Sequence, residues 1–397
     1  MSRYNSRKII GFILISFVFL CIVPTSIKSD SPDEMRYVLA YMDYEDFLDP
    51  FPKIKVRYSN DGSVWNDGDF PSDDHLDLTT HGVGLMADDY GLLNFLMFDY
   101  EYSGENRGVK IVYGLGPAIW DKSDIDAPAK EPNSAPSGIQ IGDRLYAITY
   151  TTDNNEVFVG IWDESTKSYW AGDYAPVSTL NQDVVGIPAI AILDDTVLLA
   201  WSKFTGLQFD LITSTGSFDG SHLTFTTPSV VSMPTDEYVD GCYSAPSVCN
   251  DTSKFYISVV RKEDGQSSYD VALLESQDSG STWTNHRIII SELTPGSHVN
   301  IACGDGKLLA AYIREEASSV TSVIGAKLFD PGSGWTSVDI NKNTLFGSSN
   351  AYNLQFSLIS TRKPPPISFP TGWIMSISSV LLIGLVLTLR RKIKNRK

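Results

Sequence analysis

A turn motif that recurs along the chain constrains its fold more than any other feature. The motif places a carboxylate, a glycine and a tryptophan in a fixed order, as SQDSGSTW at 276–283, DPGSGW at 330–335 and SNDGSVW at 59–65. The motif residues are Ser276, Asp278, Gly280 and Trp283; Asp330, Gly332 and Trp335; and Ser59, Asp61, Gly62 and Trp65. A motif repeated in this way indicates an architecture built from copies of one supersecondary unit.

The runs that precede these turns repeat as well, and they start near residues 81, 135, 186, 244 and 298. Each unit contains about four short segments rich in Val, Ile, Tyr, Phe and Thr, separated by clusters of Gly, Asn, Asp and Ser, which is typical of consecutive antiparallel strands. Between the chain ends no segment has the apolar period of an amphipathic helix. We therefore predict an all-β propeller of four-stranded antiparallel blades over residues 31–360.

The first unit of the repeat is incomplete. Residues 35–41 (MRYVLAY) match the second strand of the other units, and no first strand precedes them. A spare segment, 351–358 (AYNLQFSL), follows the last unit at the expected step. We predict that it forms the innermost strand of the first blade, beside Tyr37 and Tyr41, because such a closure removes open sheet edges. The predicted ring then has six blades and is closed by a C-terminal strand.

A long apolar run lies near each end of the chain. Arg3, Arg7 and Lys8 precede an apolar run, so residues 1–30 are typical of an export signal peptide, with an uncleaved anchor as the alternative. Residues 371–389 are uncharged and apolar and predict one transmembrane helix. A Pro-rich spacer, 361–370, precedes this helix, and a basic tail, 390–397, places the C-terminus in the cytoplasm. We expect a single-pass cell-membrane protein whose propeller faces outward at the cell surface.

The body of the chain is strongly acidic. Residues 31–360 contain 19 Lys and Arg against 47 Asp and Glu, a net charge of −28. Such a surface repels polyanions, so we expect no nucleic-acid partner. Solubility is the simplest explanation of the charge, and a bound cation or a basic partner is the alternative.

Three cysteines, Cys242, Cys249 and Cys303, lie in the predicted body, while Cys21 lies in the predicted signal peptide. An exported protein permits disulfide bonds. One pairing joins Cys242 to Cys249. Cys303 occupies the position in its unit that Cys249 occupies in the preceding unit, so a bridge between blades is the other pairing. The sequence leaves both open, and no Cys/His spacing resembles a zinc site.

The turn at 276–283 resembles the Asp-box, or BNR repeat, of the sialidase superfamily, and the turns at 330–335 and 59–65 resemble degenerate copies. The resemblance covers the periodic body, roughly residues 35–358, and implies a six-bladed sialidase-like propeller. It is specific for the fold rather than for activity, because non-catalytic propellers carry the same motif. An Asp side chain accepts hydrogen bonds from its own turn, so we assign Asp278 and Asp330 to structure.

In a blade of four consecutive strands, the loop after the second strand lies on the face opposite the Asp-box turns. The resemblance implies a site on that face, where sialidases hold a sugar carboxylate with three arginines. Arg107, Arg261 and Arg314 fall in such loops and are the candidates. The family's first-arginine motif, Tyr/Phe-Arg-Ile-Pro, is not found in this chain, and its tyrosine nucleophile cannot be assigned. The catalytic residues of the family therefore do not carry over.

Two histidines and one acidic run are further candidates. His81 and His298 occupy the same position of an innermost strand, where an acid/base or metal role is the alternative to a structural one. The acidic run offers oxygen ligands for calcium without the spacing of a calcium loop, and consists of Asp67, Asp69, Asp73, Asp74 and Asp77. We expect no required cofactor.

Two functions fit these features. The first is a membrane-anchored propeller that binds a glycan or protein ligand, without sialidase catalysis, because the arginine motif is missing. The second is an exo-acting glycoside hydrolase of the sialidase type with a drifted active site. A glycosidase needs two carboxylates facing each other, and the acidic loops offer many candidates without selecting a pair.

Overall fold

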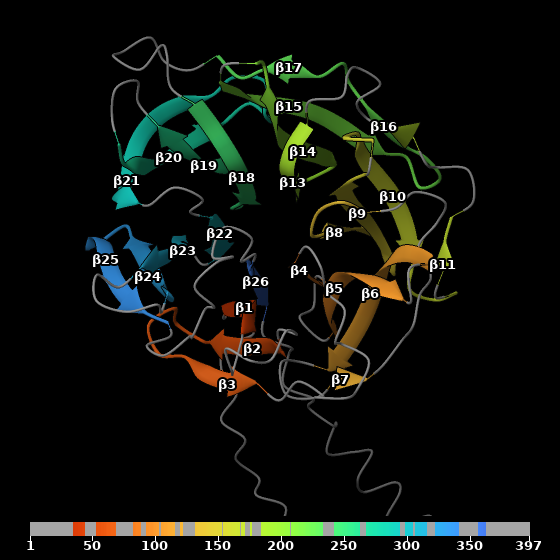
Figure 1. Cartoon of the computed structure of the whole chain (residues 1–397), viewed down its shortest axis with the longest axis horizontal. Coiled ribbons are helices and arrows are strands. Elements are labelled where there is room, and N and C mark those ends of the chain that lie inside the picture. Colours follow the sequence, from red (N-terminus) through yellow and green to blue (C-terminus); the bar gives the residue numbers. More distant parts are fainter. Residues whose placement is uncertain are drawn as a thin grey trace, which may run out of the picture. The chain divides into compact units, whose positions relative to one another are not determined.

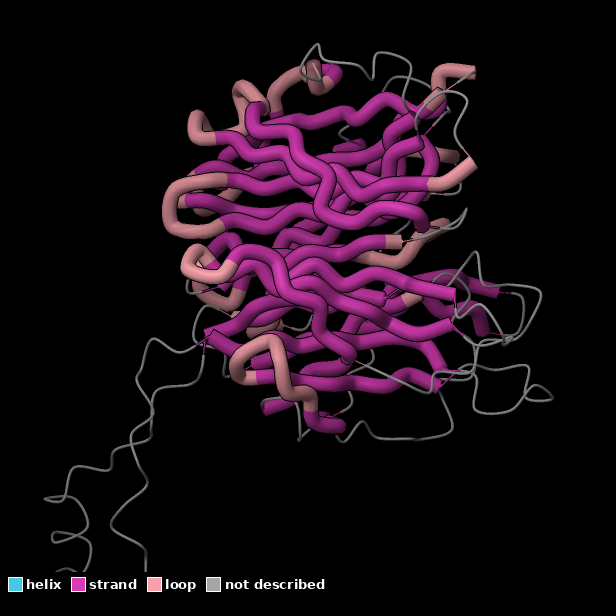
Figure 2. Tube along the Cα trace, turned by 90° about the vertical axis from the view of Figure 1, so that its left-hand side faces the viewer, coloured by secondary structure: helices cyan, strands magenta, loops and turns pink. Residues whose placement is uncertain are grey.

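The structure, a computed structural model, separates the chain into two units, of which residues 33–363 form one. It describes residues 35–43, 53–68, 82–88, 93–102, 105–115, 120–121, 132–152, 154–166, 168–170, 175–176, 184–206, 208–232, 242–262, 267–293, 298–304, 306–315, 322–340 and 356–362. Within these residues all regular elements are strands, which run between two loop-bearing faces (Figure 2). The all-β class is confirmed.

The described strands form six sheets arranged around a common centre as a β-propeller (Figure 1). Sheet 1 contains β26 (Phe356–Arg362), β1 (Met35–Asp43), β2 (Lys53–Ser59) and β3 (Asn66–Gly68). Sheet 2 contains β4 (Val83–Ala87), β5 (Leu93–Tyr102), β6 (Glu105–Leu115) and β7 (Trp120–Asp121). Sheet 3 contains β8 (Ser137–Gly142), β9 (Leu145–Thr151), β10 (Val157–Asp163), β11 (Ser168–Tyr169) and β12 (Ala175–Pro176).

The other three sheets follow in chain order. Sheet 4 contains β13 (Val184–Leu193), β14 (Thr196–Phe204), β15 (Phe209–Phe218), β16 (Leu223–Phe225) and β17 (Ser229–Val230). Sheet 5 contains β18 (Cys242–Asn250), β19 (Phe255–Lys262), β20 (Tyr269–Ser276) and β21 (Thr284–Leu293). Sheet 6 contains β22 (Val299–Gly304), β23 (Lys307–Glu315), β24 (Ser322–Asp330) and β25 (Gly334–Asp339). The innermost strands β26, β4, β8, β13, β18 and β22 each contact the next, and β22 contacts β26, so the ring is closed.

The closure joins the two ends of the propeller, as predicted. β26 pairs antiparallel with β1, with Tyr37 opposite Ser360 and Tyr41 opposite Phe356. The predicted C-terminal bound of this strand, residue 358, was wrong, because the described strand runs from Phe356 to Arg362. Residues 361 and 362 therefore belong to the sheet and not to the spacer, and residues 351–355 lie outside the described part of the chain.

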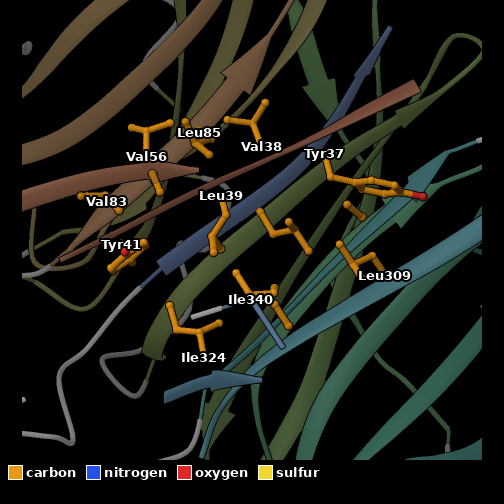
Figure 3. Close-up of a cluster of buried hydrophobic side chains, with 14 of the residues drawn as sticks. Tyr37, Val38, Leu39, Tyr41, Val56, Val83, Leu85, Leu309, Ile324 and Ile340 are labelled. Carbon is orange, nitrogen blue, oxygen red and sulfur yellow. The ribbon is translucent and has the colours of Figure 1, made fainter. Parts of the chain in front are cut away.

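Apolar side chains that alternate along each strand fill the spaces between neighbouring sheets. One cluster combines Leu39 of β1 with Val83 and Leu85 of β4 and with Leu309 and Ile324 of sheet 6 (Figure 3). Each such side chain is nearly inaccessible to water, and burying one contributes about 1.5–3 kcal/mol. Neighbouring sheets therefore pack against each other face to face, while the edges of the innermost strands line the centre of the propeller.

Proline shapes two of these inner edges. The register of β13 on β14 shifts between Val185 and Ala189, around Pro188, and that of β18 on β19 shifts between Ser244 and Ser247, around Pro246. Proline lacks the N–H that a ladder needs, so it is tolerated at a bulge on an edge strand. The repeated runs near residues 186 and 244, which contain these prolines, thus lie on innermost strands.

The part of the chain that the structure describes contains no helix with the length and apolarity to cross a bilayer. The predicted signal peptide (1–30), transmembrane helix (371–389) and basic tail (390–397) lie outside the described residues.

Candidate functional site

The carboxylate of each turn motif is held by its own turn. Asp278 accepts hydrogen bonds from the Thr282 N–H at 2.8 Å and the Thr282 hydroxyl at 2.6 Å, and the Ser276 hydroxyl donates to it at 2.8 Å. The hydrogen bonds from Thr282 lower the pKa of Asp278. Gly280 has a positive φ of 87°, and Trp283 packs behind it in the core between sheets 4 and 5.

The other two copies use the same chemistry. Asp61 accepts from the Ser63 and Val64 N–H groups at 2.8 and 3.0 Å. Although desolvation raises its pKa, the hydrogen bonds from Val64 and Ser63 outweigh this and lower the pKa of Asp61 to about 2. Asp330 accepts from the Gly332 N–H at 2.8 Å, but the positive φ of that turn, 76°, lies at Gly334 and not at Gly332. These carboxylates are engaged in turn structure.

All three turns lie on one face of the propeller, called here the turn face. The start of β1 pairs there with the end of β2, with Tyr37 opposite Ser59, and Met35 lies opposite Arg362. The chain therefore enters and leaves the ring on the turn face. The hairpin that joins β14 to β15 and the one that joins β19 to β20 lie at the other ends of their strands, on what is called here the opposite face.

A central cavity of about 150 Å³ is lined by the innermost strands. Its polar wall includes Ser247 of sheet 5, whose hydroxyl contacts Asn300 Oδ1 at 3.3 Å and accepts from the Ile301 N–H at 3.1 Å. These contacts bridge sheets 5 and 6, so the polar groups of this wall serve to join neighbouring sheets.

His298 lines the cavity at the opposite-face end of β22. It keeps some accessible surface because it faces the cavity, yet protein atoms surround it. This desolvation lowers its pKa to about 4, so its imidazole is neutral near neutral pH. His81, its predicted counterpart, lies outside the described residues.

A disulfide joins Cys249 of β18 to Cys303 of β22, with their Cα atoms 5.8 Å apart. It links neighbouring sheets 5 and 6 and confirms the pairing between blades. Cys242 lies at the other end of β18, and a strand rises about 3.3 Å per residue, so it is far from Cys249. The alternative Cys242–Cys249 pairing is therefore wrong.

Of the three candidate arginines, the structure describes the side-chain environment of Arg261. Arg261 is 1% exposed, and its Nη2 lies 3.4 Å from Asp270 Oδ2, which is on the neighbouring strand directly opposite. Arg261 is not among the described residues that line the central cavity. Arg107 and Arg314 lie on β6 and β23, and the structure describes their backbone alone.

The opposite face carries an aromatic pair that sequence reasoning missed. Phe204 and Phe209 lie directly across the β14–β15 hairpin, with ring centroids 5.2 Å apart and planes tilted by 48°. Phe204 is 36% exposed. The signal in the sequence was the run FTGLQF at 204–209, where two aromatic residues flank a short Gly-containing loop. Exposed aromatic rings on a loop-bearing face are typical of binding surfaces.

The acidic run proposed for calcium is described only at its first member. Asp67 is 80% exposed and pairs with Arg57, whose Nη2 lies 2.7 Å from Asp67 Oδ1. A cation already neutralises this carboxylate. Asp69, Asp73, Asp74 and Asp77 lie outside the described residues, and within the described ones no cluster of three or more His, Cys, Asp or Glu forms a metal site.

No protein-family model and no curated protein matches the chain. Among solved structures it is similar to a polysaccharide lyase of family 25, an ulvan lyase, with 11% identity and a TM-score of 0.46 over 75% of this chain and 80% of that one. It is also similar to a thermostable family-43 glycoside hydrolase, with 14% identity and a TM-score of 0.42 over 67% of this chain and 95% of that one. A third similar structure is an α-L-arabinanase of Cellvibrio cellulosa complexed with arabinohexaose. Its identity is 16% and its TM-score 0.42, over 65% of this chain and 96% of that one. The resemblance to the sialidase superfamily stays a prediction.

Proposed function

We propose that this protein is a membrane-anchored, outward-facing propeller that binds a glycan or protein ligand through its opposite face, without sialidase catalysis. The observation that carries the proposal is the burial of Arg261. A sialidase-type site needs cationic guanidinium groups that meet the sugar carboxylate in one open pocket. The guanidinium of Arg261 is instead enclosed within the propeller beside Asp270.

The path of the chain supports the orientation. β26 ends at Arg362 on the turn face, and the spacer that follows leads to the predicted transmembrane helix. We therefore assign ligand binding to the opposite face, which carries neither end of the described propeller.

The charge of the body supports the ligand class. A net charge of −28 over residues 31–360 disfavours polyanionic ligands. An uncharged glycan or a protein with a neutral or basic surface meets no such repulsion.

The test is a release assay on the full-length chain in polyoxyethylene detergent micelles, which carry no sugar headgroup. Sialylated and neutral fluorogenic glycosides are the substrates, and heat-denatured protein is the control. We expect no release above the control. Release by the native protein that disappears in Arg261→Ala and Arg314→Ala, while both variants keep the wild-type melting temperature, would instead establish a sialidase-type site.

A further inference from the structure

We propose that the ligand of the opposite face is an uncharged oligosaccharide and that it binds at the seam between sheets 4 and 5, defined by Phe204, Phe209, Arg261 and Asp270. This inference rests on the proposed function and names its site and ligand class. It comes from two hairpins whose last paired residues face each other across neighbouring sheets.

Strand alternation places the aromatic pair on the sheet 5 side of sheet 4. Leu198 and Ala200 of β14 belong to the core cluster shared with sheet 5, and Phe204 lies on the same side of this regular strand. Leu211 of β15 belongs to that cluster too, and Phe209 lies two residues before it on the same side. Both rings therefore stand at the outer end of the seam.

The same reasoning places the ion pair on the facing side of sheet 5. Val259 of β19 and Ala272 of β20 belong to the shared cluster, and Arg261 and Asp270 lie two residues further along each strand. Their contact across the two strands agrees with this side. The buried guanidinium is thus at the seam, while the Asp270 side chain keeps 26% of its surface exposed.

A second polar group lies on β14, two residues before Phe204. Ser202 is on the same side of β14 as Phe204 and is buried, and its hydroxyl has no hydrogen-bond partner among the described residues. A buried hydroxyl without a partner costs about 1–3 kcal/mol, so the seam holds hydrogen-bonding capacity that the apolar core does not use.

The chemistry of these groups fits a sugar. An aromatic face packs against the C–H face of a pyranose ring, and a carboxylate accepts hydrogen bonds from two neighbouring hydroxyl groups. Arg261 acts here as a positioning residue, because its guanidinium contacts the Asp270 carboxylate at 3.4 Å and holds it in place from behind. The carboxylate and the acidic body disfavour an anionic sugar, which selects an uncharged one.

The test measures binding of the full-length chain, in polyoxyethylene detergent micelles, to immobilised cellohexaose, xylohexaose, mannohexaose and arabinohexaose, with sialyllactose and hexagalacturonate as acidic arms. We expect wild type to bind at least one neutral hexaose, and Phe204→Ser to weaken that binding about tenfold or more. Asp270→Asn has the same expected effect. Phe204→Ser changes an exposed ring, so it keeps the test decisive if Asp270→Asn fails to fold.

Tyr269→Ser is the matched control. Tyr269 is the first residue of β20, as Phe209 is the first residue of β15. Tyr269 packs against the core cluster shared by sheets 5 and 6, away from the seam between sheets 4 and 5. We expect this variant to bind within about twofold of wild type. Equal binding by Phe204→Ser and wild type would overturn the seam and leave the proposed function standing. A preference for the acidic sugars, or no binding to any hexaose, would overturn the ligand class, whereas glycoside release would overturn the proposed function itself.

Discussion

The two faces of the propeller use acidic and aromatic residues in different ways. On the turn face, Asp61 and Asp278 accept hydrogen bonds from their own turns, and Trp283 is buried to 9% exposure. On the opposite face, Asp270 of β20 pairs with the buried Arg261 of the preceding strand, β19, and Phe204 is 36% exposed. The comparison teaches that the same residue types complete a repeated turn on one face and stay partly exposed on the other.

Closure of the ring supports both faces, so its loss has the largest expected effect. Deleting residues 356–362 removes the innermost strand of sheet 1 and exposes the edge of β1. We expect the cooperative unfolding transition to be lost. Circular dichroism, recorded while the protein is heated, measures this transition. Deletion of 390–397 is the control and leaves the transition in place. An unchanged melting curve after the first deletion would show that β26 does not hold the ring.

Aromatic residues on the two faces provide the sharpest contrast in stability. Trp283→Ala removes a large buried side chain between sheets 4 and 5, and we expect it to lower the free energy of unfolding by about 3–5 kcal/mol. Phe204→Ala truncates an exposed ring and should cost less than about 1 kcal/mol. Urea denaturation measures both. Similar costs for the two variants would erase the difference between the faces.

His298 makes the cavity end near the opposite face sensitive to mild acid. Its pKa is about 4 in the folded protein against 6.5 for the ordinary side chain. Between these values the unfolded chain binds more protons, so the free energy of unfolding falls as the pH decreases from about 6.5 to about 4. We expect His298→Gln to flatten this part of the pH profile in denaturant titrations. A profile identical to wild type would place His298 in a solvated environment.

Asp61 gives the turn face a smaller effect at lower pH. Its pKa is lowered from 3.8 to about 2 in the folded state, so the stability it contributes is present above pH 4 and is lost as the pH falls toward 2. Asp61→Asn should reduce the loss of stability in this window and leave the window from pH 6.5 to 4 unchanged. A variant that alters only the higher window would contradict the assignment of the two faces.

The architecture was predictable because it repeats. The match of residues 35–41 to second strands required a partner from the end of the chain, and Tyr37 indeed lies opposite Ser360. The C-terminal bound of that partner was wrong by several residues, because repeat spacing alone located 351–358 while the pairing with Met35 extends the strand to Arg362. The equivalent positions of Cys249 and Cys303 in their units indicated a possible disulfide between blades. Choosing this pairing over Cys242–Cys249 required knowing that β18 and β22 are neighbours.

The candidate site was less predictable because side-chain direction decides it. Arg261 was predicted to lie in a loop of the opposite face, yet it continues the buried alternation of Phe255, Ile257 and Val259 on β19. Its partner Asp270 is identifiable only from the register of β19 on β20. Phe204 was overlooked because aromatic residues are common in this chain and the sequence does not tell which of them stay exposed.

The pairing of β26 with β1 has a consequence for how the protein is made. Among the described strands, β1 is synthesised first, and its sheet is complete only after β26, more than 300 residues later, has been synthesised. Contacts between such distant residues are slow to form, and unpaired strand edges promote aggregation in the meantime. A polypeptide interrupted before residue 356 lacks the partner of β1, so the edge of β1 stays open and sheet 1 stays incomplete.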